Sequence, residues 1–250
     1  MDSEKTRERL LQIGVGAEKL PQDRFWDLSE AKLSGADLTG AYLHKVNLIG
    51  ADLTGADLSE ANLYEANLSR SDLTRAVLCR ANLNKACLFN AVLCSATFTG
   101  ASIAQADLRK AKLVRAIIDS QADLSQTDFS EADLHEAKLV GVGLSEANFT
   151  RANLAGADFD FTDLTRAKFN EANLTGAGFY KADLSGANFC GANLLRTNLP
   201  WANLSGVIFL TAAQLVQATR IAEAYFDGQS GHLLTAALIL RQAGKEGHKE

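Results

Sequence analysis

Residues 51–70 read ADLTG ADLSE ANLYE ANLSR, which is four copies of one five-residue unit. Each copy has an alanine, an aspartate or asparagine, a leucine and then two further residues. If the large apolar residue is called the centre, the same spacing runs from Leu28 to Ile118 and resumes from Leu124 to Phe209. The chain therefore contains 37 tandem repeats, which occupy residues 26–210.

A period of five fits extended segments and does not fit a helix, which needs apolar residues at a spacing of 3.6. Residues two apart in an extended segment face the same side, so the alanine and the centre point inward. The aspartate or asparagine between them then points to solvent. Short segments repeated without longer connections stay regular only if the chain coils and stacks each turn on the last. The sequence thus predicts an all-β solenoid.

The repeats also resemble a known family. The units ADLTG at 51–55, ADLSE at 56–60 and ANLTG at 172–176 are similar to those of pentapeptide-repeat proteins, in particular the strong A(D/N)Lxx repeats of cyanobacterial members. The resemblance implies a right-handed quadrilateral β-helix with four repeats per coil, or about nine coils in all. Centres four repeats apart should then share one face.

This face assignment predicts an aromatic column in the C-terminal half of the core. Two further phenylalanines, Phe159 and Phe179, fall on the opposite face. The column itself consists of five phenylalanines spaced twenty residues apart, namely Phe129, Phe149, Phe169, Phe189 and Phe209.

The register breaks once, because Ile118 and Leu124 are six residues apart. One extra residue must bulge outward near Ser120 while the columns resume on either side. Leu113 and Leu134 are accordingly predicted to stack as neighbours, although they are 21 residues apart in the chain.

The segments that flank the repeats are predicted to be helical and to cover the unpaired ends of the solenoid. Residues 1–25 form an N-terminal cap segment with a helix over Ser3–Ile13. Residues 211–250 form a C-terminal segment with helices over Thr211–Phe226 and Leu233–Gln242. Whether the C-terminal helices cap the solenoid or mediate association is left open.

Composition favours a cytoplasmic protein that neither crosses a membrane nor binds nucleic acid directly. The chain has 25 basic and 30 acidic residues, a net charge of -5. Its N-terminus lacks the apolar core of a signal peptide, and its longest apolar run, Leu233–Leu240, is too short to span a bilayer. Four cysteines without CxxC spacing are expected to be free thiols: Cys79, Cys87, Cys94 and Cys190.

No catalytic, cofactor-binding or metal-binding residues are predicted, and the chain is not expected to be an enzyme. Asp133, His135 and Glu136 are the best candidates for a polar site. They lie on an open convex surface, which neither excludes water nor encloses a substrate. The motifs GxGxxG and GxxxxGK[ST] are also absent from the sequence.

Charge forms bands along the chain, with net values of -5 over residues 26–67, +6 over 68–115 and -6 over 119–136. One interpretation is that neighbouring coils pair opposite charges, which fixes register; the other is that the basic band binds a partner. The predicted pairs are Lys110 with Glu131, Lys112 with Asp133 and Arg115 with Glu136. The candidate basic band consists of Arg70, Arg75, Arg80 and Lys85, which fall on consecutive faces.

A second candidate surface is an aromatic strip, defined as Phe161, Tyr180, Pro200 and Trp201, at outward positions of three consecutive coils. Exposed tyrosine and tryptophan are enriched in binding hot spots. Three interpretations remain open: the C-terminal segment folds back over the strip, the strip mediates self-association, or it binds a foreign partner.

These features favour a non-enzymatic scaffold or protein-interaction module that presents rigid flat faces, with an unidentified protein partner and with a homodimer through the C-terminal segment as an open alternative. Resemblance to the gyrase-inhibitor members of the family implies a second function, that of a DNA-mimicking modulator of DNA gyrase. The charges of the four faces do not favour it, because no face is a continuous acidic stripe that would imitate phosphates.

Overall fold

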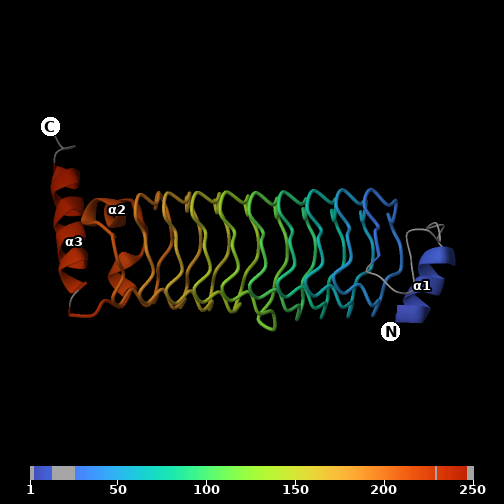
Figure 1. Cartoon of the computed structure of the whole chain (residues 1–250). Helices are drawn as coiled ribbons and strands as arrows, with labels where there is room; N and C mark the ends of the chain where they lie inside the picture. Colours follow the sequence, from blue (N-terminus) through green and yellow to red (C-terminus); the bar gives the residue numbers. More distant parts are fainter. Residues whose placement is uncertain (1–2, 13–25, 229, 247–250) are drawn as a thin grey trace.

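The chain folds into a straight rod with a helix or helices at each end (Figure 1). The computed structural model describes residues 3–12, 26–228 and 230–246. Helix α1 spans Ser3–Gln12 at one end. At the other end lie α2 (Ala212–Gln217), the 3₁₀ turn η2 (Ile221–Glu223) and α3 (Gly231–Glu246), and α3 runs across the rod (Figure 1).

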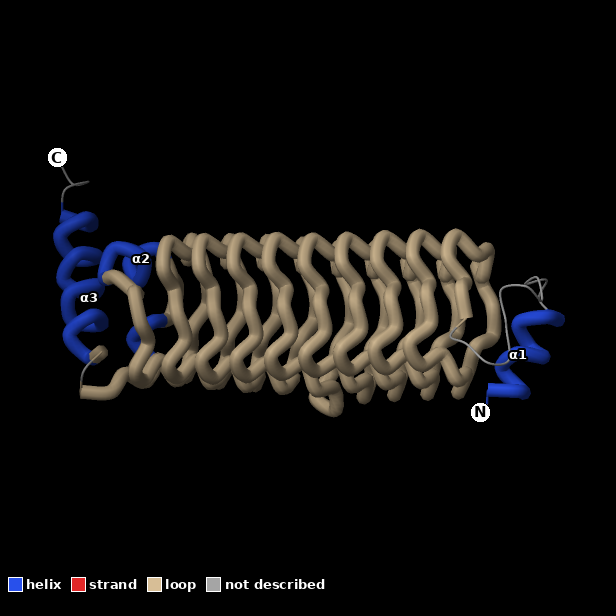
Figure 2. The backbone as a smooth tube through the Cα atoms, in the orientation of Figure 1, coloured by secondary structure: helices blue, strands red, loops and turns tan. Residues whose placement is uncertain are grey.

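Between the helices the chain is a β-solenoid held together by four ladders of parallel bridges. Each bridge up to Asn188–Ile208 joins residues 20 or 21 apart, so one coil has 20 or 21 residues. Each side of a coil contributes a single bridge residue, which is why the backbone is drawn as loop in Figure 2. We number the ladders by their first members: Asp27 begins the first ladder, Lys32 the second, Asp37 the third and Tyr42 the fourth.

The five-residue unit closes each corner with a turn. Ala56 N–H donates to the carbonyl of Leu53 at 3.0 Å, which is the hydrogen bond of a β-turn. The third residue of this turn, Gly55, has φ +65°, as a type II turn requires. Asp52 Oδ1 accepts the Thr54 N–H at 3.1 Å, and where the residue before a centre is aspartate or asparagine this bond satisfies the corner backbone in many other coils. The centres and the alanines before them are buried, as expected.

The phenylalanine column forms in the core, but it is one residue shorter than predicted. Neighbouring rings from Phe129 to Phe189 stack at centroid distances of 5.0, 5.2 and 5.3 Å. The assignment of Phe209 to the column is wrong, since its φ of +55° turns its side chain outward and leaves it 68% exposed. Leu210 is buried instead and leads directly into α2.

The extra residue is accommodated in a three-residue corner formed by residues 119–121, which protrudes near the middle of the rod (Figure 1, green). Leu113 N–H donates to the carbonyl of Asp133 at 2.7 Å, so the predicted 21-residue offset is confirmed. Asp119 Oδ1 accepts the Gly100 N–H at 3.1 Å. In a regular coil the acceptor of this N–H is a backbone carbonyl. The Gly50 N–H, for example, donates to the carbonyl of Ser69.

The prediction of a continuous helix over Thr211–Phe226 is wrong. Helix α2 ends at Gln217, because the chain then returns to the ladders: Thr219 bridges Asn198 and Tyr225 bridges Asn203. These bridges carry the solenoid beyond the predicted boundary at residue 210. Near the end of the second ladder, Gln214 Nε2 donates to the carbonyls of Phe189 and Ala192, both at 2.9 Å. Helix α3 is longer than the predicted Leu233–Gln242.

At the other end α1 contacts the first coil. The Tyr42 N–H donates to Thr6 Oγ1 at 2.9 Å, and Leu10 is buried against the core. Arg9 forms an ion pair with Asp37 at 3.3 Å. The rest of the predicted cap segment, residues 13–25, lies outside the described part of the chain.

Candidate functional site

Exposed large apolar side chains gather along one side of the rod. Ile117 is a member of the third ladder and is 42% exposed, while Val140, Phe161 and Trp201 lie in the corners that follow this ladder and are 37%, 55% and 59% exposed. We call these corners the third edge. The third ladder itself consists of Asp37, Asp57, Val77, Thr97, Ile117, Lys138, Asp158, Gly178, Asn198 and Thr219.

The aromatic side chains of the third edge stand at a backbone position that disfavours them. Phe161 and Trp201 both have φ +60°, the left-handed conformation of the corner. Glycine takes this place in the same column at Gly40, Gly100 and Gly141, whereas Glu60, Arg80 and Lys181 take it in other coils. The left-handed conformation is therefore a general feature of the corners and does not by itself mark a functional residue.

Three side chains of the edge form a compact cluster. The rings of Phe161 and Tyr180 meet edge to face at a centroid distance of 5.1 Å and an angle of 89°. The Lys181 ammonium lies 5.2 Å from the Tyr180 ring and 5.9 Å from the Phe161 ring, which is within the range of a cation–π interaction. The cluster is thus a preformed aromatic surface that carries one positive charge.

The structure separates Pro200 from the rest of the predicted strip. Pro200 is buried rather than exposed, and its carbonyl accepts the Lys181 N–H at 3.0 Å. The interpretation in which the C-terminal segment folds back over the strip is wrong for Phe161 and Trp201, which stay more than half exposed beside the described part of that segment. The segment closes the end of the rod instead (Figure 1).

Asp160 lies beneath the aromatic cluster. Its Oδ1 accepts the Tyr180 N–H at 2.7 Å, a bond that in a regular corner is made by the residue before the centre. That residue is Gly178 here, and a Cβ on it would come within 3.3 Å of Asp160 Oδ1. Partial burial raises the pKa of the Asp160 carboxyl, and the nearby charge of Asp158 acts in the same direction against the hydrogen bond from Tyr180.

The four residues of the candidate basic band lie on consecutive corners of one coil. Its side chains also occupy the left-handed corner position, with φ values between 57° and 60° for Arg70, Arg75, Arg80 and Lys85. Arg80 forms an ion pair with Glu60 at 3.4 Å, and the Lys85 ammonium lies 5.7 Å from the Tyr64 ring. Half of the band is therefore engaged with the neighbouring coil.

Charge pairing between coils occurs in two stretches of the chain, residues 45–80 and 110–171. Of the predicted pairs, Lys110–Glu131 and Arg115–Glu136 form at 3.5 and 2.7 Å. Lys112 and Asp133 are neighbours in the second ladder, but Asp133 Oδ1 accepts hydrogen bonds from His135 N–H and Asn153. The further pairs are Lys45–Glu65, Glu146–Arg166 and Arg151–Glu171.

His135 and Glu136 of the polar candidate lie side by side with exposed side chains. His135 Nε2 lies 3.4 Å from Glu136, whose other oxygen is held by Arg115. Within the part of the chain that the structure describes, no three His, Cys, Asp or Glu side chains could hold a metal ion together. None of the helices in the described segments is long and apolar enough to cross a membrane.

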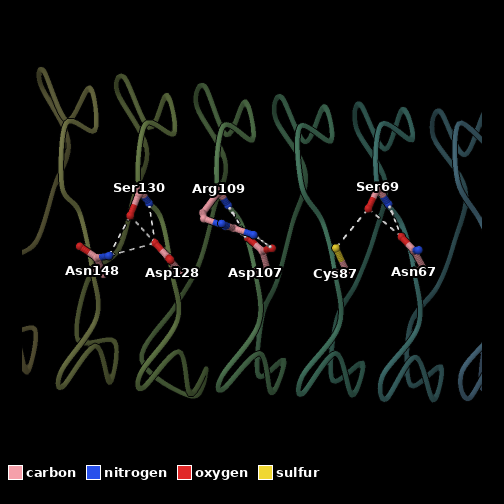
Figure 3. Close-up of polar contacts among 8 residues, drawn as sticks. All are labelled: Asn67, Ser69, Cys87, Asp107, Arg109, Asp128, Ser130 and Asn148. Atoms are coloured by element: carbon pink, nitrogen blue, oxygen red, sulfur yellow. Dashed lines mark hydrogen bonds and ion pairs between the residues drawn. The ribbon is translucent and has the colours of Figure 1, made fainter.

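The first ladder shows how polar groups on a flat face satisfy one another (Figure 3). Arg109 donates to both oxygens of Asp107 at 2.8 and 2.7 Å, which lowers the pKa of that carboxyl. One coil further on, Asn148 Nδ2 donates to Ser130 Oγ at 2.8 Å and to Asp128 at 3.2 Å. These side chains are already paired, so they leave little for a ligand.

The four cysteines are free thiols.

Sequence analysis missed a second aromatic group, on the fourth ladder near α1. The His44 ring lies 6.0 Å from the ring of Tyr42 and stacks on that of Tyr64 at 5.5 Å. The signal was available, since these aromatic residues recur at outward positions about twenty residues apart. Ile117 and Val140 were also missed. Each is a single aliphatic residue among polar ones, and the two are recognised as part of one surface only when the ladders are aligned.

Comparison with known proteins agrees with the repeat pattern. A family model described as a pentapeptide repeat region matches residues 120–189, and a second, described as pentapeptide repeats, matches residues 27–59, 56–93, 90–113 and 172–209. No curated protein sequence matches significantly.

The solved structures that are similar include HetL and QnrB1. HetL, a pentapeptide repeat protein involved in heterocyst differentiation regulation from the cyanobacterium Nostoc sp. strain PCC 7120, is 29% identical with a TM-score of 0.43, and the match covers 84% of this chain and 93% of HetL. Full-length QnrB1, a plasmid-mediated fluoroquinolone resistance protein, is 18% identical with a TM-score of 0.45, over 85% of this chain and 96% of QnrB1.

Proposed function

The chain belongs to the pentapeptide-repeat family, and from that premise we propose that it is a non-enzymatic scaffold that binds proteins through its rigid faces. The proposal includes the shape expected from the sequence, a right-handed four-sided rod of about nine coils with helical caps. Free thiols favour a reducing compartment, and the cytoplasm remains the expected one.

The observation that carries the proposal is the aromatic cluster of the third edge. Phe161 and Tyr180 pack edge to face with Lys181 beside them, and Trp201 lies in the next corner of the same edge. Phe161 and Trp201 are more than half exposed, so they contribute little to the core. Exposed aromatic side chains with an adjacent lysine are typical of a protein-binding surface.

The left-handed positions of Phe161 and Trp201 allow a test of whether these side chains bind a protein. Phe161→Gly/Trp201→Gly removes both side chains while relieving the backbone, so the fold should be kept or made more stable. The matched control is Asn90→Gly/Gln105→Gly, which makes the same change at left-handed corners of other ladders. We expect affinity capture from the native host, read by quantitative mass spectrometry, to lose partners with the first variant and keep them with the control. Identical capture by both variants would show that the strip is not the contact.

The alternative function, a DNA-mimicking modulator of DNA gyrase, is less well supported. A mimic of duplex DNA needs unpaired negative charge along its faces. Here Glu136 and Glu171 are each paired with an arginine of the preceding coil. A gyrase supercoiling assay decides the matter, since inhibition at submicromolar protein would establish the alternative.

A homodimer through residues 211–250 is an alternative mode of self-association, in place of one through the aromatic strip. It is supported by an exposed apolar surface on α3, made by Leu238, Ile239 and Leu240. Leu238→Asp/Ile239→Asp should convert such a dimer to monomer in sedimentation velocity, because a buried charge without a partner is costly.

A further inference from the structure

We infer that the third edge is occupied by a second copy of this chain, packed face to face in the opposite direction. The inference rests on the proposed function, because it takes the exposed aromatic strip to be a protein contact and names the protein. Its evidence is the order of charges and of side-chain sizes along four successive coils.

The charges along the third edge alternate from coil to coil. Lys138 lies on the first of the four coils, Asp158 and Asp160 on the second, and Lys181 on the third, while the fourth carries the uncharged Trp201. Bridges from Lys138 to Asp158 and onward to Gly178 place these coils in direct succession. The lysines lie on exposed positions, and successive coils are about 4.8 Å apart.

Only one of the two symmetric ways to pack two such rods matches these charges. In a parallel pair each coil faces its own copy, so Lys181 would meet Lys181 and Asp160 would meet Asp160. In an antiparallel pair, a two-fold axis across the rods between the second and third coils places Asp160 opposite the partner's Lys181, and Lys181 opposite the partner's Asp160. A two-fold interface makes every such contact twice, and complementary charges fix its orientation.

Side-chain sizes fit the same arrangement. The axis places the fourth coil of one rod opposite the first coil of the other, so Trp201 faces the corner of the partner's Gly141. Gly141 has no side chain, and the small residue Ser120 packs against it, since a Cβ on Gly141 would lie 2.9 Å from Ser120 Cβ. Trp201 would therefore lie over these two small residues, beside the partner's exposed Val140 and Lys138. Phe161 would face the partner's Lys181, a second cation–π contact.

The apolar surface of α3 does not carry an equivalent argument. Leu238, Ile239 and Leu240 are exposed, but no charged side chain described next to them sets a register or a direction for a partner. The third edge has both an apolar surface and an ordered series of charges, and it is presented by the rigid part of the rod. Substitutions on α3 thus serve as a control.

The test is sedimentation velocity of the purified full-length chain over a micromolar concentration range. We expect wild type and Asn90→Gly/Gln105→Gly to be dimers and Phe161→Gly/Trp201→Gly to be a monomer with an unchanged circular dichroism spectrum. Lys181→Glu should raise the dissociation constant at least about tenfold, because it places an acidic group against Asp160 of the partner at both copies of this contact. Asp160→Lys/Lys181→Glu should restore the dimer in the antiparallel arrangement but not in the parallel one.

Three outcomes would overturn the inference. The first is a wild-type chain that is monomeric at every concentration. The second is a dimer that survives Phe161→Gly/Trp201→Gly and is lost in Leu238→Asp/Ile239→Asp, which would place the contact on α3. The third is a double charge reversal that folds but fails to restore association. A monomer that still captures a foreign protein through Phe161 and Trp201 would overturn this inference and keep the proposed function, whereas a monomer that captures nothing would overturn both.

Discussion

At the scale of the residue, the position before each centre has a structural role that its exposure does not suggest. Asp57 Oδ1 accepts the Ser59 N–H at 2.9 Å, and most other coils repeat this bond with aspartate or asparagine. A corner N–H left without a partner would lose about 1 to 3 kcal/mol on partial burial. The short side chains of these two residues reach the N–H two positions on, which explains why they recur where the pattern alone suggests only a solvent-facing polar residue.

The exception at Gly178 leads to a first prediction, which concerns Asp160. Burial raises the pKa of this carboxyl, so the folded state favours the neutral acid and its ionisation costs stability above that pKa. Asp160→Asn keeps an oxygen to accept the Tyr180 N–H and removes the charge. We expect a higher melting temperature than wild type at neutral pH, with a difference that shrinks as pH falls through the pKa of Asp160.

The matched control is Asp52→Asn, at an ordinary corner. Hydrogen bonds from the hydroxyl and N–H of Thr54 lower the pKa of Asp52, so its charge stabilises the fold at neutral pH and the substitution should lower the melting temperature. Both measurements belong at protein concentrations where the chain is monomeric. Equal effects of the two substitutions would show that the environment of Asp160 has been misjudged.

At the scale of the element, the phenylalanine column separates two residues that look alike in the sequence. Phe169 is fully buried between stacked rings, whereas Phe209 is exposed. Phe169→Ala should destabilise the fold by about 3 to 5 kcal/mol through the cavity it creates. Phe209→Ala should change stability by no more than about 0.5 kcal/mol. Urea unfolding followed by circular dichroism measures both, and comparable losses would contradict the outward turn at Phe209.

The three-residue corner gives a third prediction, that deletion of Ser120 is tolerated. The deletion restores a corner of ordinary length, in which a backbone carbonyl can replace the Asp119 carboxylate as acceptor of the Gly100 N–H. The protein should stay soluble and melt within a few degrees of wild type. Deletion of Ser145 from a regular corner is the control, and it should be strongly destabilising. Insoluble protein from the Ser120 deletion would mean that folding depends on the extra residue.

The sequence predicts the repetitive part of this fold well because one periodic rule governs it. The stacking of Leu113 on Leu134 follows from counting by fives across a single break. Counting fails at Phe209, which takes the left-handed conformation directly after the ladder residue Ile208, so Leu210 is buried in its place. It also fails between Thr211 and Phe226. The apolar residues there have helical spacing, but part of the segment forms an irregular last coil that bridges the ladders.

The candidate site could be predicted only in part. Phe161 and Trp201 could be predicted, because the repeat rule defines which positions point outward and both residues are aromatic. The burial of Pro200 could not be predicted, since it depends on the segment that returns after α2 and lets Glu223 accept the Trp201 N–H. The contribution of Asp160 depends on a hydrogen bond between coils, which the linear pattern does not contain.

At the scale of the whole molecule, the rod is a stack in which each coil contacts mainly its two neighbours. Its charge bands are arranged so that neighbouring coils carry opposite charges. Glu60 pairs with Arg80 and Lys110 with Glu131, so opposite charges meet at the same corner of successive coils. Each exposed pair contributes only about 0 to 1 kcal/mol, but a slip by one coil would break most of them together. The bands therefore favour the correct register as much as they add stability.

The last prediction is that this stack loses stability in acid. Hydrogen bonds from Arg115 and Arg151 lower the pKa values of Glu136 and Glu171 below the ordinary value of 4.5. A carboxyl whose folded pKa lies below its unfolded one adds stability above the ordinary value, and loses it as pH falls through the folded pKa. The melting temperature should therefore be nearly constant around neutral pH and fall below pH 4.5, the ordinary value for these groups.

Salt and substitution identify the source of that fall. High salt should reduce the difference between neutral and acid pH, because exposed pairs are screened. Arg115→Gln/Arg151→Gln should reduce it as well, since Glu136 and Glu171 then keep nearly ordinary pKa values in the folded state. Asp160 acts in the opposite direction, so Asp160→Asn should make the acid fall slightly steeper. A fall in acid that neither salt nor the arginine substitutions alter would show that protonation of other carboxyls, such as the corner acceptors before the centres, is what destabilises the rod.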